Sequence, residues 1–556
     1  MKRFYLLAAI AALALPVPNQ AADTPRKPNI LFVLSDDHSY PFLGCYGTAE
    51  MKTPNLDRFA AEGIKFHRMF TTAPQCVPSR ASIMTGRSPV ACRITRFSSP
   101  LPREEVTFPE LLKKDAGYFV GVLGRTHHLD GSGNGPEVSE RVFQENRMHT
   151  FKTRFDYVDV SNQQMVPQRM KEFFDVRPKD KPYFLWVNFN DPHHPWNTGK
   201  HPPDPATLKV PGYLPDLPGV RKDLSLYLGE IEHADEDFQT VLDIVKDRAG
   251  LENTLVFFMG DNGLAFPSGK GCLHDPGLNV PLLAWWPGVI KPGGDSRVIL
   301  SGEDIAPTCL QAAGLSVPPF MSGVSFLAEL KGEVFTPRSF IFAERGPHGG
   351  AAFTEKTAAN AVDYSRCARS DHYKLIYNVT PNLRYLPVDS AGDSGWQEIT
   401  KAHEELRLAT EFETLYFTSP RPVYELYDLQ NDPNELHNLA GREELAAVER
   451  ELKEALQKKM ILDFDYLPLP IPNDRKPGAA KANANRQNNA SREALFEKLD
   501  ANHDGKLSFE EFSANRDRAE AEAWFKARDT NSDGVLDKEE FLRATLPNAP
   551  LRQRNK

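Results

Sequence analysis

The stretch NILFVLSDDH, residues 29–38, indicates a buried strand, because a short apolar run ends there abruptly in two acids. Four more short apolar runs follow, and three of them also end in polar or charged residues. They are YFVGVLGRTHH at 118–128, YFLWVNFNDPHH at 183–194, TLVFFMGDNG at 254–263 and PLLAWW at 281–286. Runs of this kind are typical of strands that are buried on both faces of a parallel sheet.

Amphipathic helical patterns lie between these strands. NLDRFAAEG at 55–63 ends at a glycine, and LSLYLGEIEHADEDFQTVLDIVKDRAG at 224–250 does the same. Strands that alternate with helices predict an α/β domain with a mixed, largely parallel sheet flanked by helices. In such sheets the site lies at the carboxyl ends of the strands, which is where this sequence places Asp, Asn, Arg and His.

The character of the chain changes near residue 340. SFIFAE, HYKLIYN and PVYELYDL predict shorter, antiparallel strands, and GREELAAVERELKEALQKKMI predicts an amphipathic helix with Leu445, Val448, Leu452 and Leu456 on one face. Residues 466–490 lack hydrophobic periodicity and are rich in Pro, Ala, Asn and Lys, which indicates a linker. A final module of about sixty residues follows it.

The amino terminus predicts export. Residues 1–22 place Lys2 and Arg3 before a short apolar run that ends in small residues, as in a secretory signal peptide. An N-terminal anchor or a buried helix is the alternative. We expect a periplasmic or extracellular protein with no membrane span after signal removal. The net charge of −9 over 556 residues, without a basic run at either end, argues against nucleic acid as a partner.

Six cysteines are too sparse and too irregularly spaced to form a disulfide framework. Export permits disulfide bonds, but the spacing predicts no pairing. Whether the cysteines other than Cys76 form bridges is therefore open.

Two stretches in the final module have the pattern of EF-hand calcium loops. DANHDGKLSFEE at 500–511 and DTNSDGVLDKEE at 529–540 carry oxygen donors at loop positions one, three, five, nine and twelve, with Gly at six. The alternative is a pair of acidic loops on a solvated surface. The predicted Ca²⁺ ligands are Asp500, Asn502, Asp504, Ser508 and Glu511 in the first loop, Asp529, Asn531, Asp533, Asp537 and Glu540 in the second, and the peptide carbonyls of Lys506 and Val535.

Acids at two strand ends form a second candidate metal site. Asp36 and Asp37 follow one apolar run, and Asp261 and Asn262 follow another. Four hard oxygen ligands without a thiolate favour Ca²⁺ or Mg²⁺ over zinc. Because Asp is also common at strand-to-helix turns, each pair alone is weak support for a metal.

The stretch TTAPQCVPSRASIMTGRSP at 71–89 places a cysteine where a helix is expected to start. Pro78 suits the first turn, and Gly86 ends the pattern. Cys76 then lies at a helix N-terminus, where backbone N–H groups favour an anion, and Arg80 can turn toward the same anion. From these residues alone, a buried structural cysteine and a nucleophilic thiolate both stay open.

CVPSRASIMTG at 76–86 resembles the signature of the type I sulfatases, in which a maturation enzyme converts the cysteine of C-x-P-S-R to formylglycine. SDD before this signature, and GRTHH, NDPHH, GDNG and YELYDLQNDPNELHNL after it, occur in the order of that family. The resemblance covers about residues 27–465 and implies an alkaline-phosphatase-like fold.

The resemblance also implies roles for single residues. The aldehyde hydrate at Cys76 attacks sulfur, and Asp36, Asp37, Asp261 and Asn262 hold a Ca²⁺ ion that also binds residue 76. The remaining roles belong to basic residues. Arg80 stabilises the hydrate, Arg125, His193 and Lys270 surround the sulfate, His193 donates a proton to the leaving group, and His127 helps the second hydroxyl lose its proton.

The sequence departs from the family pattern at two positions. Arg125 stands where the family has Lys in G-K-x-H, so a planar donor replaces a point charge. Lys270, in GDNGLAFPSGKG, stands where the heparan N-sulfatase branch has Arg. That stretch, together with NDPHH and GWQEITKAHEELRL, resembles this branch, which removes N-linked sulfate from glucosamine at a chain end.

We therefore expect a sulfatase that acts on a sulfated saccharide, with N-sulfoglucosamine as one candidate substrate. The alternatives are an O-sulfatase for another polysaccharide, a phosphodiesterase or phosphonate hydrolase, and a calcium-binding surface protein with an inactive scaffold. The expected boundaries are 1–22 for the signal peptide, 27–340 for the catalytic domain, 341–465 for a smaller α+β subdomain, 466–490 for the linker and 491–546 for an appended all-α EF-hand pair.

Overall fold

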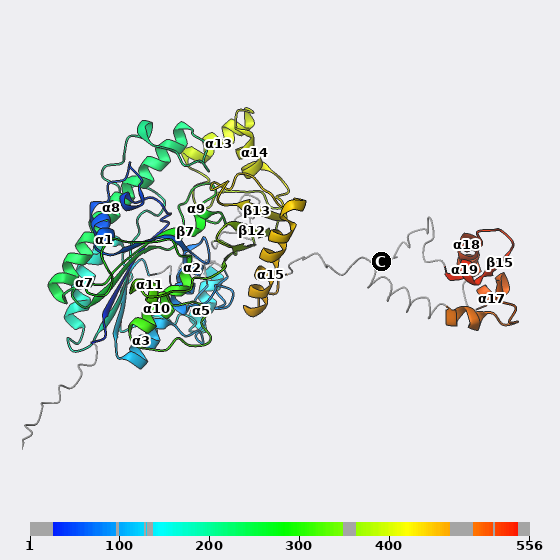
Figure 1. Ribbon diagram of the computed structural model, residues 1–556, viewed down its shortest axis with the longest axis horizontal. Helices are drawn as coiled ribbons and strands as arrows, with labels where there is room; N and C mark the ends of the chain where they lie inside the picture. Colours follow the sequence, from blue (N-terminus) through cyan, green and yellow to red (C-terminus); the bar gives the residue numbers. More distant parts are fainter. Residues whose placement is uncertain are drawn as a thin grey trace, which may run out of the picture. The chain divides into compact units, whose positions relative to one another are not determined.

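The computed structural model describes residues 26–95, 99–126, 129, 137–348, 363–467, 493–514 and 518–542. The chain divides into two compact units, Met1–Leu469 and Pro470–Lys556 (Figure 1). The expected signal peptide, most of the expected linker and both His127 and His128 lie outside the described residues. Within the described residues, none of the helices combines the length and the apolar character needed to cross a bilayer.

A mixed sheet of nine strands lies at the centre of the large unit in the described part of the chain (Figure 1). The strand order is β4-β3-β5-β1-β6-β7-β2-β8, and β9 pairs with β2. Strands β1, β3, β5 and β6 are parallel neighbours, whereas β7 runs antiparallel to β6 and β2. The strand bounds are β1 Asn29–Ser35, β2 Ile64–Phe70, β3 Phe119–Gly124, β4 Tyr157–Val158, β5 Tyr183–Asn188, β6 Thr254–Gly260, β7 Asn279–Trp285, β8 Gly294–Ser296 and β9 Leu300–Ser301. All five apolar runs form strands, which confirms the predicted sheet.

Helices cover both faces of this sheet. Side chains of β1 alternate between two cores, with Phe32 in one and Val33 in the other. Helices α2, α3 and α10 pack on the first core, and α1, α7 and α8 pack on the second, on opposite sides of the sheet in Figure 1. Their bounds are α1 Pro54–Glu62, α2 Cys76–Thr85, α3 Phe108–Ala116, α7 Val166–Val176, α8 Pro218–Arg248 and α10 Ile305–Ala312.

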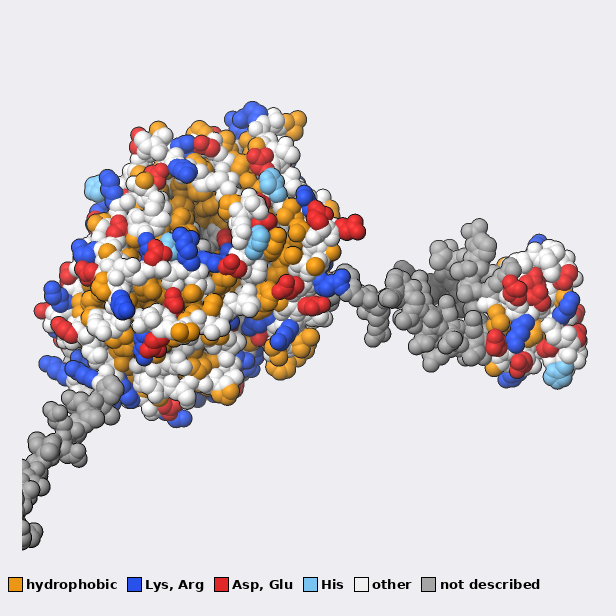
Figure 2. All heavy atoms as spheres, in the orientation of Figure 1, with side chains coloured by type: hydrophobic (Ala, Val, Ile, Leu, Met, Phe, Trp, Pro, Cys, Tyr) orange, Lys and Arg blue, Asp and Glu red, His pale blue; other side chains and the backbone are white. Residues whose placement is uncertain are grey.

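Shorter helices complete the large unit. The α-helices are α5 Glu137–Glu145, α6 Phe151–Arg154, α9 Asp275–Leu278, α11 Leu327–Leu330, α13 Ser394–Glu404 and α14 Thr410–Phe417. The 3₁₀ helices are η1 Gly44–Tyr46, η2 Gln163–Met165, η3 Pro205–Thr207, η4 Gly302–Asp304 and η5 Glu443–Leu445. On the face shown in Figure 2, acidic and basic side chains of this unit are interspersed.

A second, antiparallel sheet begins where the composition changes. It has the order β10-β11-β12-β13, with bounds β10 Ile341–Arg345, β11 Ser365–Arg369, β12 Tyr373–Asn378 and β13 Tyr424–Asp428. Helix α15, Ala446–Leu462, packs on one face through Leu452 and Leu456. The other face meets the first sheet around Phe70 and Ile376. The predicted subdomain boundary at residue 340 stays a prediction, because both sheets lie in one compact unit.

The small unit has two similar halves in its described residues. Strands β14 Lys506–Ser508 and β15 Val535–Asp537 pair in antiparallel register, and helices α17 Phe509–Ser513, α18 Arg518–Arg528 and α19 Lys538–Leu542 surround them. Phe496, Phe512, Phe525 and Phe541 form the core. The predicted helical module therefore also contains a two-stranded sheet that links its two loops.

Candidate active site

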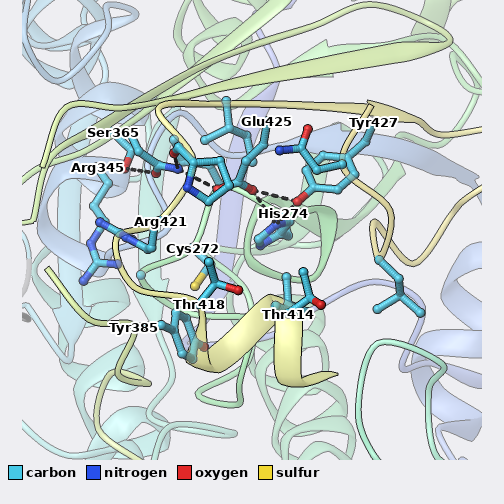
Figure 3. A pocket seen from close by; sticks show the side chains of 18 residues that line it. Cys272, His274, Arg345, Ser365, Tyr385, Thr414, Thr418, Arg421, Glu425 and Tyr427 are labelled. Carbon is cyan, nitrogen blue, oxygen red and sulfur yellow. Dashed lines mark hydrogen bonds and ion pairs between the residues drawn. The ribbon is translucent and has the colours of Figure 1, made fainter. Parts of the chain in front are cut away.

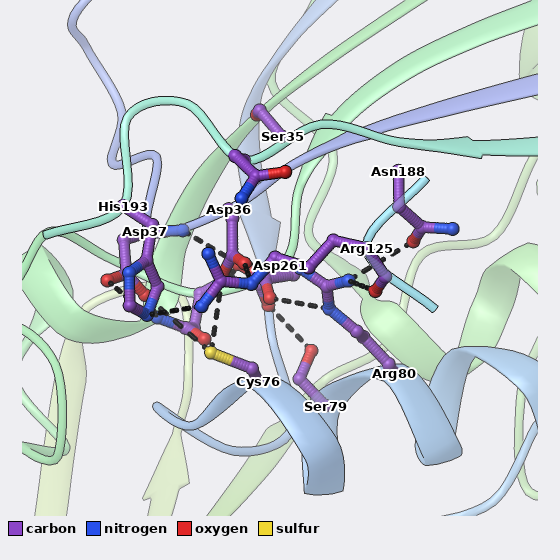
Figure 4. Close-up of polar contacts among 12 residues, drawn as sticks. Ser35, Asp36, Asp37, Cys76, Ser79, Arg80, Arg125, Asn188, His193 and Asp261 are labelled. Carbon is purple, nitrogen blue, oxygen red and sulfur yellow. Dashed lines mark hydrogen bonds and ion pairs between the residues drawn. The ribbon is translucent and has the colours of Figure 1, made fainter. Parts of the chain in front are cut away.

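The candidate site lies where three elements meet at the carboxyl edge of the first sheet (Figure 4). Strands β1 and β6 are parallel neighbours with Ser35 opposite Gly260, so the acids that follow each strand lie side by side. Cys76 is the first residue of α2 and is fully buried. The predicted helix start and its end at Gly86 are both confirmed, since the Gly86 N–H bonds the Ser82 carbonyl in a left-handed cap.

The acids and the cysteine form one compact, buried group. The Cys76 thiol donates to Asp36 Oδ1 at 3.3 Å and lies 3.8 Å from Asp37 Oδ1. Asn262 Nδ2 donates to Asp37 Oδ1 at 2.8 Å, and the Asp37 N–H donates to Asp261 Oδ1 at 2.9 Å. Asp37 has φ +62°, a left-handed conformation that is uncommon outside glycine and is typical of functional turns.

Three basic side chains neutralise this group of acids. Arg80 Nε lies 2.8 Å from Asp261 Oδ2, and its Nη2 lies 3.1 Å from Asp36 Oδ2. The other two basic side chains are Arg125, whose Nε lies 2.9 Å from Asp36 Oδ2, and Lys270, whose Nζ lies 2.9 Å from both carboxylate oxygens of Asp37. Arg80 and Lys270 are themselves buried, so these ion pairs are shielded from solvent.

His193 lies beside two of these cations. Its Nε2 is 3.1 Å from Lys270 Nζ, 3.3 Å from Arg125 Nη2 and 3.7 Å from Asp37 Oδ2. Burial lowers the pKa of His193, and Lys270 lowers it further, so the imidazole is neutral at neutral pH in the free chain. A bound anion between these three groups favours the protonated imidazole.

The electrostatics of the acids and of the thiol bear on the chemistry. Burial and the neighbouring carboxylate of Asp36 raise the pKa of Asp261 to about 7, although Arg80 lowers it. Burial raises the pKa of the Cys76 thiol well above its usual range, and Asp36 raises it further. A thiol with a raised pKa carries little thiolate at neutral pH, so the unmodified cysteine is a poor nucleophile.

The donor set fits a hard divalent cation. The side-chain Oδ1 of Asn262 is buried and has no hydrogen-bond partner among the described residues. One ligand atom each from Asp36, Asp37, Cys76 and His193 lies within 4.8 Å of the others. Three clustered carboxylates and an unpartnered amide oxygen are oxygen ligands of the type that Ca²⁺ takes.

The structure brings together every predicted sulfate-site residue that it describes. These are Asp36, Asp37, Cys76, Arg80, Arg125, His193, Asp261, Asn262 and Lys270. His127 lies outside the described residues, so its predicted role stays a prediction. The neighbouring His194 lies with its Nε2 2.9 Å from Asp393 Oδ2 and packs against Trp196.

Several side chains at the site were missed by the sequence reasoning. Ser79 Oγ donates to the Asp261 carbonyl at 2.6 Å, and Asn188 Oδ1 accepts from Arg80 Nη1 at 3.1 Å. Asp389 Oδ2 lies 2.8 Å from Lys270 Nζ. Asn188 ends strand β5 and shares the strand-end signal of the acids, whereas Asp389 lies in an irregular segment that carries no comparable signal.

The EF-hand loops have the backbone geometry of the motif. Gly505 and Gly534 have φ +79° and +84°, as the sharp turn at position six requires. The N–H groups of Asp504 and Gly505 bond the Asp500 carboxylate, which turns the first loop inward. In the second loop, Asp529, Asp533 and Glu540 bring ligand atoms within 4.8 Å of one another.

Comparison with known families identifies the class of protein. Residues 28–315 match the model of the sulfatase family, residues 268–386 and 395–461 match the model described as N-sulphoglucosamine sulphohydrolase, C-terminal, and residues 493–514 and 521–544 match the EF hand. The chain belongs to the sulfatase family and is a hydrolase of sulfuric esters or sulfamates. The expected resemblance is confirmed.

Individual relatives agree with this assignment. An ulvan-active sulfatase of Formosa agariphila is 28% identical over 80% of this chain and 83% of its own length. The human N-sulphoglucosamine sulphohydrolase is 26% identical over 78% of this chain and 90% of its own.

Solved structures share the fold. One, a protein in complex with its substrate D-glucosamine-2-N,6-O-disulfate, matches with TM-score 0.58 and 20% identity over 80% of this chain and all of the other. A phosphonate monoester hydrolase from Silicibacter pomeroyi matches with TM-score 0.58 and 18% identity over 79% of this chain and 96% of the other. These similarities confirm the predicted alkaline-phosphatase-like fold.

Proposed function

We propose that this chain is an exported, calcium-dependent sulfatase that uses formylglycine, formed from Cys76, to remove sulfate from a sulfated saccharide. The observation that supports this most strongly is the position of Cys76. The residue is buried at the N-terminus of α2, its Sγ contacts two acids, and its raised pKa makes a thiolate mechanism unfavourable. A maturation enzyme that oxidises the cysteine is then a required partner.

The proposed metal ligands are Asp36, Asp37, Asp261 and Asn262, with residue 76 beside them. A Ca²⁺ ion held there would lower the pKa of the attacking hydroxyl and offset the charge that develops on the sulfate oxygens. The raised pKa of Asp261 and the unpartnered Asn262 oxygen support a cation at this position. Arg80 keeps Asp36 and Asp261 in place from the other side, through contacts of 3.1 and 2.8 Å.

The basic residues give the site its selectivity for an anion. Arg125 and Lys270 both lie beside His193, at 3.3 and 3.1 Å from its Nε2. A sulfate that enters between them meets two fixed positive charges and raises the pKa of His193. His193 then donates a proton to the leaving oxygen or nitrogen of the substrate, and His127 is proposed to accept a proton in sulfate release.

The substrate class rests on the relatives. Their names include an ulvan-active sulfatase, an N-sulphoglucosamine sulphohydrolase and an N-acetylgalactosamine-6-sulfatase, so a sulfated saccharide is the shared chemistry. The match of the C-terminal part to the N-sulphoglucosamine sulphohydrolase model supports an N-sulfated glucosamine, as in the breakdown of glycosaminoglycans. An O-sulfated polysaccharide is the second candidate, supported by the ulvan-active relatives.

The small unit is proposed to bind two Ca²⁺ ions through its EF-hand loops. The loop geometry and the family match support this. The pattern of residues 1–22 supports export to the periplasm or the extracellular space.

The test measures products from defined substrates. The full-length protein, produced with its maturation enzyme and Ca²⁺, is assayed for sulfate release from matched N- and O-sulfated saccharides and for alcohol release from model phosphonate monoesters and phosphate diesters. Sulfate release that is faster than hydrolysis of the phosphorus esters, and that is lost in Cys76→Ala, is the expected result. Full activity of Cys76→Ala would exclude the mechanism. Faster hydrolysis of the phosphorus esters would favour a phosphonate hydrolase or phosphodiesterase, and no turnover of any ester would favour an inactive scaffold.

A further inference from the structure

A second cavity, with a volume of about 70 Å³, lies beside the candidate active site (Figure 3). Its walls come from residues 271–274, from strands β10 to β13 and from helix α14. A volume of this size has room for about two water molecules or for one small anionic group. The lining mixes apolar side chains such as Ile376 and Leu415 with the polar groups of Ser365, Asn378 and Thr418.

Two arginines on one side of this cavity share a single carboxylate. Arg345 Nη1 lies 3.1 Å from Asp363 Oδ2, and Arg421 Nη2 lies 2.6 Å from Asp363 Oδ1. The Nε atoms of both arginines are buried without a hydrogen-bond partner among the described residues. Only 4% of the Arg345 side chain and 12% of the Arg421 side chain are exposed. One carboxylate for two buried guanidinium groups leaves a positive charge without a counter-ion and donors without acceptors.

The opposite side of the cavity offsets only part of this charge, because the acid on that side, Glu425, attracts both Arg421 and His274. His274 lies 3.5 Å from Glu425, with Tyr427 beside them in Figure 3. Burial lowers the pKa of His274, but its contacts with Cys272 and the neighbouring acids outweigh burial and raise the pKa to about 10. Three cations, Arg345, Arg421 and His274, thus face two carboxylates, those of Asp363 and Glu425, so one positive charge is in excess among these groups.

The cavity and the candidate active site share a backbone segment. Lys270 contacts Asp37 and His193, and Cys272, two residues further on, lines the cavity. Two residues span at most about 7 Å of chain. Gly271 between them has φ +79°, and a Cβ there would lie 3.6 Å from the Arg345 guanidinium carbon and 2.4 Å from a Val388 methyl. Lys270 and Arg345 thus flank one glycine.

We propose that this cavity binds a second anionic group of the saccharide, a carboxylate or a further sulfate, through Arg345 and Arg421. This inference rests on the proposed function, because it assumes a saccharide that carries its cleaved sulfate to residue 76. Guanidinium groups match the planar geometry of carboxylate and the oxygen edges of sulfate. Thr418 on the same lining offers a hydroxyl group to the saccharide, whereas Ser365 and Asn378 are hydrogen-bonded to each other.

The test uses Arg421→Gln, because Asp363 keeps Arg345 as a partner in this variant. Arg421→Lys keeps the charge, and Arg407→Gln removes an exposed arginine that pairs with Glu405 and does not line the cavity. Three substrates share the cleaved sulfated sugar: the sugar alone, the sugar linked to a uronate, and the sugar with a second sulfate. The sugar alone carries one anionic group, and each of the other two substrates carries two. Arg421→Gln is expected to lower kcat/KM about 10- to 100-fold more for one of these two than for the sugar alone, because it removes one charge-assisted hydrogen bond.

The outcomes separate the subsite from the function. Arg421→Lys is expected to recover part of the loss, and Arg407→Gln is expected to match the wild type. A preference for the uronate or for the second sulfate identifies the anion. Equal losses on all three substrates would overturn the subsite while the sulfatase function stands. If the wild type hydrolyses none of them, the proposed function fails, and thermal stabilisation by glucuronate or inorganic sulfate decides the subsite. Equal stabilisation of wild type and Arg421→Gln would then overturn it.

Discussion

Replacing Arg80 by methionine is expected to lower the free energy of unfolding of the large unit by about 3–5 kcal/mol in the absence of calcium. Arg80 and its two partners, Asp36 and Asp261, have fully buried side chains. Asp36 keeps Arg125 at 2.9 Å after the change, but Asp261 has no other ion-pair partner among the described residues. The variant therefore leaves one buried carboxylate without a cation, and methionine retains most of the volume.

Urea denaturation followed by tryptophan fluorescence measures this loss. Arg248→Met is the matched control, because Arg248 pairs with two exposed acids at the surface, and its loss is expected to stay below about 1 kcal/mol. Added Ca²⁺ is expected to restore part of the stability of Arg80→Met, since a cation beside Asp261 replaces the missing charge. A loss of less than about 1 kcal/mol without calcium would refute the view that Arg80 offsets the acids.

Three further changes probe other parts of the molecule. His193→Gln is expected to lower kcat about 10²- to 10⁴-fold for a saccharide sulfate but much less for an activated aryl sulfate, whose leaving group needs little protonation. Equal losses of kcat on the two substrates would contradict a proton-donor role. Burial raises the pKa of Glu230 from 4.5 to about 7, so Glu230 binds a proton more readily in the folded chain than in the unfolded chain. The free energy of unfolding therefore falls as the pH rises through this window, by up to about 1.4 kcal/mol per pH unit. Glu230→Gln removes that slope in denaturation measured from pH 4.5 to 7, and an unchanged slope would contradict the assignment. Glu540→Gln is expected to weaken calcium binding by the small unit, measured by Trp524 fluorescence, without changing the rate of sulfate release. A loss of turnover that accompanies the loss of calcium binding would instead show that the two units are coupled.

The strands and their terminal acids were predictable because their signals are local. Each apolar run ends at a sheet edge, and the parallel register brings Asp37 and Asp261 together without further information. Helix α8 begins at Pro218, six residues before the expected start. The first residues of the helix lack the apolar periodicity on which the expectation is based, but a proline suits the first turn of a helix.

Other features depend on packing that no local pattern carries. Strand β11, SRCAR, has no apolar alternation, yet it is buried because Arg366 pairs with Asp465 and Arg369 pairs with Asp275. Asp389 reaches Lys270 from an irregular segment more than a hundred residues away. The cavity near Arg345 likewise forms only when the second sheet packs beside the loop that follows Lys270.

The chemical state of residue 76 tests the central claim most directly. Mass spectrometry of the proteolytic peptide that contains Cys76, taken from protein with measured sulfate release, distinguishes a thiol from an aldehyde that reacts with a hydrazide probe. We expect formylglycine in the active protein and an unmodified thiol in inactive protein made without the maturation enzyme. An unmodified thiol throughout fully active protein would contradict it.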